Sequence, residues 1–235
     1  MAGAIAPFSR KEPFTQHCPW DRLQYAGLHA ALQRGAEVRF CSPDGMLATR
    51  NGQHFLAGKV DLTPFLPEIQ LLLVHEESLA DSLLASGAFS EQLTCLQAVY
   101  LPHDPPAYRI DGLSFRVLTM DDFSFVHGHY HTGRNSQSSY IKTRLINGDL
   151  MGGFVGNQCA GFVGIHREGA IGMLEVLPDF RRRGIGMALE AEMIRRLLNQ
   201  KFLPYCHVFP DNVNSLSLQQ KLGLSIAPRP IHWVC

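Results

Sequence analysis

The sequence predicts a mixed α/β (α+β) protein in two parts, the second of which carries a mainly antiparallel sheet with flanking helices. Three prolines at 102–106 interrupt the chain near its middle, and proline continues neither a helix nor a central strand. Three β-like segments then follow in close succession over 151–176, joined by short, turn-prone links that are typical of antiparallel strands. An amphipathic stretch at 186–199 adds a helix that can cover such a sheet.

The proline-rich stretch predicts a division into two domains. A chain of 235 residues is one large domain or two small ones, since domains commonly have about 150 residues. We expect an N-terminal α/β domain of unknown role at 1–100, a proline-rich linker at 101–111 and a second domain at 112–235.

The first part alternates helical and β-like patterns. Leu23, Ala26 and Ala30 recur at helical spacing, and Pro43-Asp44-Gly45 is turn chemistry between two β-like runs. The expected elements are a helix at 20–34, strands at 37–41, 46–49 and 69–74, a helix at 77–86 and a strand at 96–100.

The second part has more regular patterning. The pattern places Glu190, Arg195 and Arg196 on the polar face of its longest helix. Glu192 and Arg196 form a favourable i,i+4 pair, and Gly223 ends its last helix. The expected elements are a strand at 115–118, helices at 121–131 and 137–147, strands at 151–155, 158–166 and 170–176, a helix at 186–199, a strand at 205–209, a helix at 213–222 and a strand at 231–234.

The composition excludes several function classes. Lys plus Arg number 21 and Asp plus Glu number 21, so there is no global basic field for nucleic acid. The longest aliphatic run, 71–74, is far shorter than the roughly 20 residues that span a bilayer. The N-terminus lacks a signal-peptide pattern, and the six cysteines form no C-x-x-C pair. We therefore expect a cytoplasmic protein without nucleic-acid or membrane partners.

One segment has the features of an anion site. Arg181, Arg182 and Arg183 precede Gly184 and Gly186, and the two glycines open the long amphipathic helix. The first amides of a helix have no intrahelical partners and lie at the positive end of its dipole, so they bind phosphate well. The arginines add charge-assisted hydrogen bonds to a diphosphate. The alternative is a solvated arginine cluster at an ordinary helix start.

These residues also resemble a known family. The pattern V-x-P-x-x-R-x-x-G-x-G over 176–186 resembles the coenzyme A signature of the GCN5-related N-acetyltransferase (GNAT) superfamily. Asn212-x-x-Ser215 and Gln219-x-x-x-Gly223 resemble that superfamily's final helix. The segments 205–212 and 228–235 are most similar to its glycine N-acyltransferase-like branch. In that branch an α/β region precedes the catalytic domain, sometimes as a degenerate copy of it, and residues 1–100 are compatible with this.

The resemblance implies a GNAT acyltransferase domain at 112–235, in which two neighbouring strands splay apart and acyl-coenzyme A enters between them. The strand ending at Val176 would pair with the pantetheine arm, and amides between Arg182 and Met187 would hold the diphosphate. The implied coenzyme-binding residues are Leu174, Glu175, Val176, Arg181, Arg182, Arg183, Gly184, Ile185, Gly186, Met187, Asn212, Ser215 and Gln219.

The implied reaction is direct attack of an amine on the thioester, which needs a base because alkylamines titrate near pH 10. Gln219 stands where the superfamily often has a tyrosine that protonates the thiolate, and Ala170 stands where several relatives have a glutamate base. His207 and Glu175 are the two candidates for the catalytic base. The alternative for Glu175 is a structural pair with a nearby arginine.

A cluster of histidines has three interpretations. His127, His129 and His131 lie in one predicted helix, with Tyr130 inside the cluster and Tyr140 in the next helix. His127 and His131 are at i,i+4 spacing, which fits a metal pair. In the resembled fold this helix borders the acceptor pocket, so the side chains could also line it or lie on the surface. We expect no metal.

We therefore expect an enzyme that transfers an acyl group, acetyl being favoured, from acyl-coenzyme A to a primary amine of a small molecule in a ternary complex. One alternative is a regulator or sensor that binds acyl-coenzyme A without catalysis, which the departures at Gln219 and Ala170 motivate. Another is a protein N-acetyltransferase.

Overall fold

The computed structural model describes residues 19–131 and 137–235. The strands are β1 Glu37–Cys41, β2 Gly45–Arg50, β3 Gln53–Gly58, β4 Leu72–Val74, β5 Gln92–Val99, β6 Leu113–Val117, β7 Leu150–Val155, β8 Gln158–Ile165, β9 Ile171–Val176, β10 Tyr205–Val208, β11 Ser225–Ile226 and β12 Ile231–Val234. The helices are α1 Ala26–Gln33, α2 Glu77–Ala85, α3 Phe123–His129, α4 Ser138–Ile146, α5 Ile185–Asn199 and α6 Val213–Lys221.

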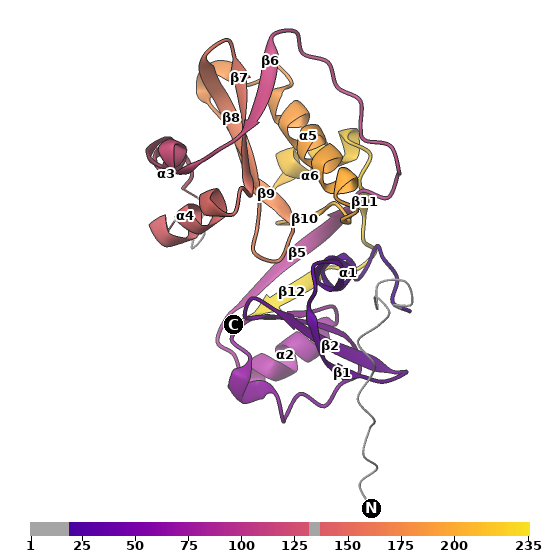
Figure 1. The fold of residues 1–235 in the computed structure, drawn as a ribbon. Helices are drawn as coiled ribbons and strands as arrows, with labels where there is room; N and C mark the ends of the chain where they lie inside the picture. Colours follow the sequence, from indigo (N-terminus) through magenta and orange to yellow (C-terminus); the bar gives the residue numbers. More distant parts are fainter. Residues whose placement is uncertain (1–18, 132–136) are drawn as a thin grey trace, which may run out of the picture.

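All the strands belong to one twelve-stranded sheet (Figure 1). Its order is β1-β2-β3-β4-β12-β5-β10-β9-β8-β7-β6, with β11 paired to β5 outside this path. The β3–β4 and β9–β10 pairs are parallel, and the other pairs are antiparallel. The expected mixed α/β fold with a mainly antiparallel sheet is therefore confirmed.

The last strand of the chain lies within the first half of the protein. Strand β12 pairs with β4 on one side and β5 on the other. Strand β5, in turn, pairs with β10 from the second half. Residues 101–111 contain no helix or strand, but the sheet runs through both halves without interruption. The domain boundaries at 100 and 112 stay a prediction.

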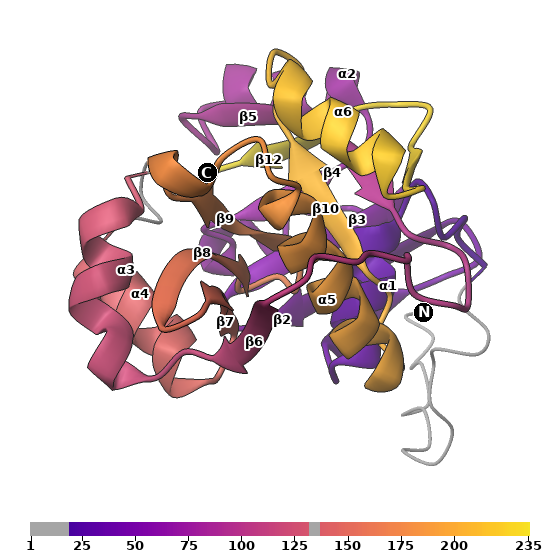
Figure 2. The same cartoon turned by 90° about the horizontal axis from the view of Figure 1, so that it is seen from above.

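Helices cover both faces of the sheet. Figures 1 and 2 show α3 and α4 on one side of strands β7 to β9, and α5 on the other side. Apolar side chains of α5 pack with the buried Val163 and Ile171, whereas Phe162 and Met173 on the opposite face pack with α3 and α4. Phe162 and Val163 are consecutive on β8 and therefore point to opposite faces, whereas on β9 a bulge at Met173 turns this side chain away from the face of Ile171.

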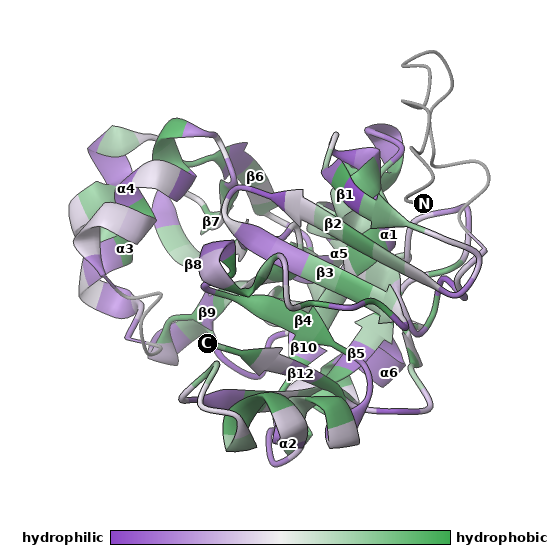
Figure 3. Ribbon diagram, turned by 90° about the horizontal axis from the view of Figure 1, so that it is seen from below, coloured by the Kyte–Doolittle hydropathy of each residue, from purple (hydrophilic) through white to green (hydrophobic). Residues whose placement is uncertain are grey.

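In the first half, β4 is apolar throughout, as its green colour in Figure 3 shows, and all three of its residues are buried. A short apolar run bounded by turns is typical of such a central strand. It lies between β3 and β12, and the side chains of α1 and α2 complete the clusters above and below it. In the described residues no helix has the length and apolar character needed to cross a membrane.

Several elements differ from the sequence-based expectation, among them β11, which was not expected, and β5, which begins at Gln92 rather than at 96. Strand β3 was not expected, because its buried run His54-Phe55-Leu56-Ala57 shows no clear alternation of apolar and polar residues. The expected helix at 20–34 begins at Ala26. The expected helix at 121–131 is a 3-10 turn at Met120–Asp122 followed by α3, which ends at His129.

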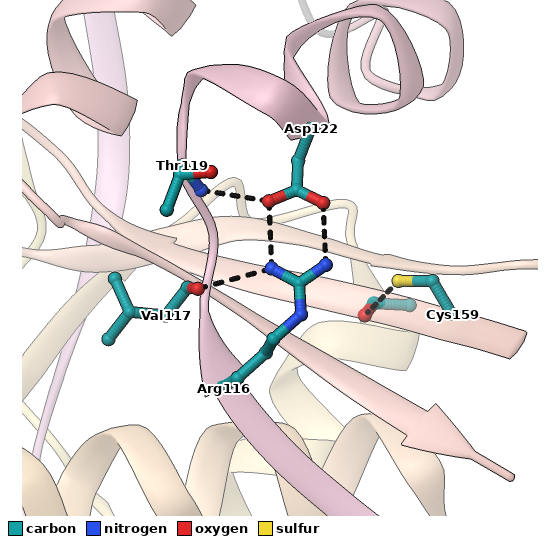
Figure 4. A network of polar contacts seen from close by, with 6 residues as sticks. Arg116, Val117, Thr119, Asp122 and Cys159 are labelled. Atoms are coloured by element: carbon teal, nitrogen blue, oxygen red, sulfur yellow. Dashed lines mark hydrogen bonds and ion pairs between the residues drawn. The ribbon is translucent and has the colours of Figure 1, made fainter. Parts of the chain in front are cut away.

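A charged cap fixes the start of that helical segment to the sheet edge (Figure 4). The Arg116 guanidinium on β6 donates two hydrogen bonds to Asp122, at 2.8 and 2.7 Å, and the Thr119 backbone N–H donates a third at 2.8 Å. These contacts lower the pKa of Asp122, with the Arg116 hydrogen bonds as the largest cause. Thr119 and Asp122 form a capping box, which satisfies amides that the helix start leaves free.

Candidate functional site

The site is built around the point where β9 and β10 separate. In the described chain these parallel strands share a single register pair, Ile171 with Cys206. The β8–β9 and β5–β10 pairs each hold four or more register pairs. Both strands therefore keep their outer neighbours but diverge from each other as they run toward Val176 and Val208. The sequence resemblance implied such a divergence.

A β-bulge sharpens the divergence. Phe162 pairs with Glu175 and Gly164 with Gly172, so one residue of β8 faces two of β9. Met173, inside the bulge, has a φ of 51°, in the left-handed region that side-chain-bearing residues seldom adopt. Bulges bend a strand and redirect its side chains. Here the bulge lies one residue beyond the last pair between β9 and β10.

The N-terminus of α5 follows directly after β9. Gly184 caps the helix with a φ of 77°, a conformation that glycine adopts without strain. The first helical hydrogen bond joins the Ala188 N–H to the Gly184 carbonyl, so the amides of Ile185, Gly186 and Met187 are not used inside the helix. A Cβ on Gly186 would lie 3.4 Å from the Val176 side chain, which shows how closely the helix start approaches the strand end.

The arginines before α5 differ from one another. Arg181 is tied to β9: its Nε donates to the Val176 carbonyl at 2.9 Å, and its guanidinium lies 3.1 Å from the Glu175 carboxylate. Arg183 lies over the Phe180 ring at 5.7 Å. Within the described residues, the side chains of Arg182 and Arg183 make no hydrogen bond or ion pair. Two of the three arginines are therefore available to an anion.

The residues expected on the final helix lie in α6. Asn212 caps this helix, and its Oδ1 accepts a hydrogen bond from the Ser215 N–H at 3.1 Å. Such a cap alone explains an asparagine at this position. Gln219 is only 2% exposed, and its Oε1 is buried without a hydrogen-bond partner in the described structure. Asn212 and Ser215 keep their expected role along the pantetheine arm as a prediction.

Beside Gln219 lies a buried acid, Glu190, for which the expected place on the polar face of the helix is wrong. Glu190 on α5 is 3% exposed, and burial raises its pKa to about 7, while a hydrogen bond from Gln219 opposes the rise. The Glu190 charge in turn contributes to a raised pKa of the Cys206 thiol, for which burial is the main cause. Around the helix Glu190 lies between Ile194 and Leu197, which are apolar and buried, and these neighbours were the available signal.

His207, on β10, has both ring nitrogens engaged. The Trp233 indole N–H donates to its Nδ1 at 3.3 Å, and its Nε2 lies 3.3 Å from the Gln97 Oε1. Since Nδ1 accepts, the proton is on Nε2 and faces Gln97. Burial lowers the pKa of His207 to about 4. A base here would first have to lose one of these partners, so the geometry weighs against His207.

Glu175 has the partner that its structural alternative requires. Its pair with Arg181 joins two partly exposed side chains at 3.1 Å, and a screened pair of this kind is weak. The carboxylate is therefore held in place without being sealed off. A catalytic role for Glu175 stays a prediction, and so does the one for His207.

A second histidine lies close to the divergence point, and the sequence analysis did not select it. His166 follows β8, and its Nδ1 lies 2.8 Å from the Tyr140 hydroxyl of α4. Its charge contributes to the lowered pKa of His207, so the two imidazoles are near each other. Only the fold brings Tyr140 and His166 together, because they are 26 positions apart.

Two histidines of the cluster, His127 and His129, lie on α3 and have local partners, whereas His131 lies beyond the end of this helix, so the expected i,i+4 helical pair with His127 is not formed. His127 stacks on Phe123 and its Nε2 lies 3.1 Å from the Ser138 hydroxyl, while His129 contacts the carbonyl of Phe125 at 2.7 Å. Tyr130 is buried in the core below α3 and α4. Within 19–131 and 137–235 there is no group of three or more His, Cys, Asp or Glu arranged to hold a metal ion. The absence of a metal stays a prediction.

Comparisons with known proteins agree with this geometry. The model of the family FR47-like protein matches residues 152–234, which include β9, the start of α5 and β10. No curated protein matches the sequence. A Drosophila protein structure is 18% identical, with a TM-score of 0.65 over 81% of this chain and 73% of that one.

Two bacterial protein structures also resemble this chain, with TM-scores above 0.5. A GCN5-related N-acetyltransferase from Kribbella flavida is 10% identical, with a TM-score of 0.55 over 89% of this chain and 93% of that one. A GCN5-related N-acetyltransferase-like protein from Streptococcus suis is 15% identical, with a TM-score of 0.53 over 91% and 95%. The glycine N-acyltransferase-like branch stays a prediction. The chain has the fold of the GNAT superfamily, with an FR47-like segment that contains the diverging strands.

Proposed function

We propose that the protein is an acyl-coenzyme A-dependent N-acyltransferase that transfers acetyl to a primary amine of a small molecule. The observation that carries this proposal is the separation of β9 from β10 directly beside the free N-terminal amides of α5. Such amides, together with two arginines that make no hydrogen bond or ion pair within the described residues, suit a diphosphate.

The residues fit the co-substrate in their chemistry. Amides of Gly184, Ile185, Gly186 and Met187 would hold phosphate oxygens, with Arg182 and Arg183 adding charge. The edge of β9 at Leu174 to Val176 that faces away from β8 has no pairing strand among the described residues beyond Ile171, so it can pair with an extended amide-bearing arm. When bound, acyl-coenzyme A supplies the activated thioester.

The acceptor must be a neutral amine when it attacks. Because alkylamines are mostly protonated at neutral pH, a residue on this chain or a water molecule has to accept a proton. Among the residues expected from sequence, Glu175 is better placed than His207, whose two nitrogens already have partners. No metal is needed for this chemistry.

Calorimetry with free coenzyme A tests the binding part. The double variant Arg182→Glu/Arg183→Glu places two negative charges beside the diphosphate and should weaken binding at least 100-fold. Arg109→Glu, an exposed change in the linker segment, is the control and should bind as the wild type does. Equal coenzyme A affinity of the double variant and the wild type would refute the proposed diphosphate site at the start of α5.

Thiol release from acetyl-coenzyme A tests the transfer part. The wild type is incubated with glycine, spermidine, kanamycin and a lysine-containing peptide, and free thiol is measured. Release with one of the small amines supports the proposal, and release only with the peptide supports a protein N-acetyltransferase instead.

One observation favours the second candidate, a sensor of acyl-coenzyme A. Gln219, in the position of the proton-donating tyrosine, cannot act as an acid and is almost fully buried against Glu190. Tight binding of acetyl-coenzyme A without thiol release from any acceptor would establish the sensor.

A further inference from the structure

An imidazole lies over the start of β9, where Ala170 and Gly172 have no polar side chain of their own. Ala170 and Gly172 lie on the face opposite the α5 core, and Ala170 is 1% exposed. A Cβ on Gly172 would collide with Nε2 of His166. The His166 ring therefore lies directly over the strand, one residue beyond the last pair between β9 and β10.

Two sets of contacts fix this ring. The backbone N–H of His166 donates to the Ala170 carbonyl at 2.8 Å, and the backbone N–H of Gly169 donates to the His166 carbonyl at 2.9 Å. These two hydrogen bonds close the β8–β9 turn. The Tyr140 hydroxyl lies 2.8 Å from Nδ1. Arg50 and Gln53 of the first half contact the same turn, at the Arg167 carbonyl and the Glu168 carboxylate.

The other ring nitrogen of His166 has no such contact. Within the described residues, Nε2 has no hydrogen-bond partner, and it is not among the polar atoms sealed from solvent. His207 differs, because Trp233 and Gln97 occupy both of its nitrogens. Of these two imidazoles near the divergence point, only His166 can offer a free nitrogen without breaking a contact.

We propose that His166 is the catalytic base that accepts the proton of the acceptor amine, and that Tyr140 is its positioning residue. The proposal rests on the proposed acyltransferase function and names the residue that the sequence analysis lacked. In this proposal Nδ1 carries the resting proton and donates a hydrogen bond to the Tyr140 oxygen, which leaves the Nε2 lone pair free.

The step balances without another reactant. The neutral amine forms a bond from its nitrogen to the thioester carbonyl carbon, and the carbon–sulfur bond breaks with its electron pair going to the thiolate. The proton that the nitrogen loses passes to Nε2 of His166, directly or through one water. His166 then releases this proton to solvent or to the thiolate.

The charged neighbours of His166 support this role. Burial lowers the pKa of His166, which keeps the ring neutral at neutral pH. Glu168, in the same turn, opposes the change and would stabilise the ring once it is charged, while Arg144 on α4 adds to the lowering. The neutral ring can therefore accept a proton, and a carboxylate is at hand for the charged form.

The test compares variants with the acceptor that the wild type turns over fastest in the thiol-release panel. His166→Gln keeps a side chain that can contact Tyr140 but removes the base. We expect kcat to fall about 100-fold, in the usual range for a lost general base, with coenzyme A affinity unchanged by calorimetry. Added imidazole should restore part of the activity of His166→Ala. His103→Gln, in an exposed loop, is the control.

Tyr140→Phe separates positioning from structure. It should lower kcat about 10-fold and leave the KM for acetyl-coenzyme A unchanged. It should also change the pKa that the acidic limb of the kcat/KM pH profile gives for His166. Full activity of His166→Gln in a wild type that turns over would overturn the inference and leave the proposed function standing. A wild type that binds coenzyme A but releases no thiol with any acceptor would overturn both.

Discussion

The buried acid on α5 gives the sharpest test of the packing described above. Glu190 is 3% exposed, and burial raises its pKa from 4.5 to about 7. The folded protein therefore keeps a proton on this carboxyl that the unfolded chain releases above pH 4.5. Stability is lost as pH rises from about 4.5 to 7 and is level above that window.

The size of the effect follows from the shift. One pKa unit corresponds to about 1.4 kcal/mol, so linkage predicts that Glu190 costs the wild type about 2 kcal/mol of unfolding free energy between pH 5.5 and pH 8. Glu190→Gln removes the titration and keeps the shape, and the new amide can donate to the orphaned Oε1 of Gln219. The variant should gain that amount over the wild type across this range.

Urea unfolding followed by tryptophan fluorescence at pH 5.5, 6.5 and 8 measures this difference. Histidines also titrate here, but they contribute equally to both proteins and cancel. Glu192→Gln is the control: an Arg195 hydrogen bond lowers the pKa of Glu192, so its difference from the wild type should stay constant. A Glu190→Gln difference that changes by less than about 0.5 kcal/mol across the range would refute the raised pKa.

Three further predictions concern single contacts. Gly184→Ala should lower the unfolding free energy by about 1 kcal/mol, because the φ of 77° is strained for alanine. Gly128→Ala in α3, where a Cβ has open space, should not lower the unfolding free energy. Equal urea midpoints of the two variants would contradict this. Trp233→Phe removes the donor to Nδ1 of His207 and should raise its pKa from about 4 by about one unit, as NMR titration can measure; an unchanged titration would show that the contact is unimportant. Asp122→Asn loses the charged cap of the segment before α3 and should cost about 1 kcal/mol at pH 7, and this cost should shrink as the pH falls through the lowered pKa of the wild-type acid. A cost independent of pH would mean that the cap does not depend on charge.

The sequence could predict the parts of the site that are local in the chain. The strand ending at Val176, the arginine loop, Gly184 and the helix from Ile185 form one continuous segment. Its turn, its free amides and its amphipathic stripe depend on neighbouring residues, which periodicity and glycine placement report directly. The resemblance to the GNAT signature rests on the same segment, and the fold agrees with it.

The tertiary structure alone decided the rest, because it depends on how elements order themselves in the sheet. Nothing near residue 231 indicates that β12 inserts between β4 and β5, or that its Trp233 reaches His207. Likewise, the pairing of Tyr140 with His166 joins a helix to a turn across the sheet. Short-range patterns determine which segments become strands and helices, but partners distant in sequence are set by burial and register in the completed sheet.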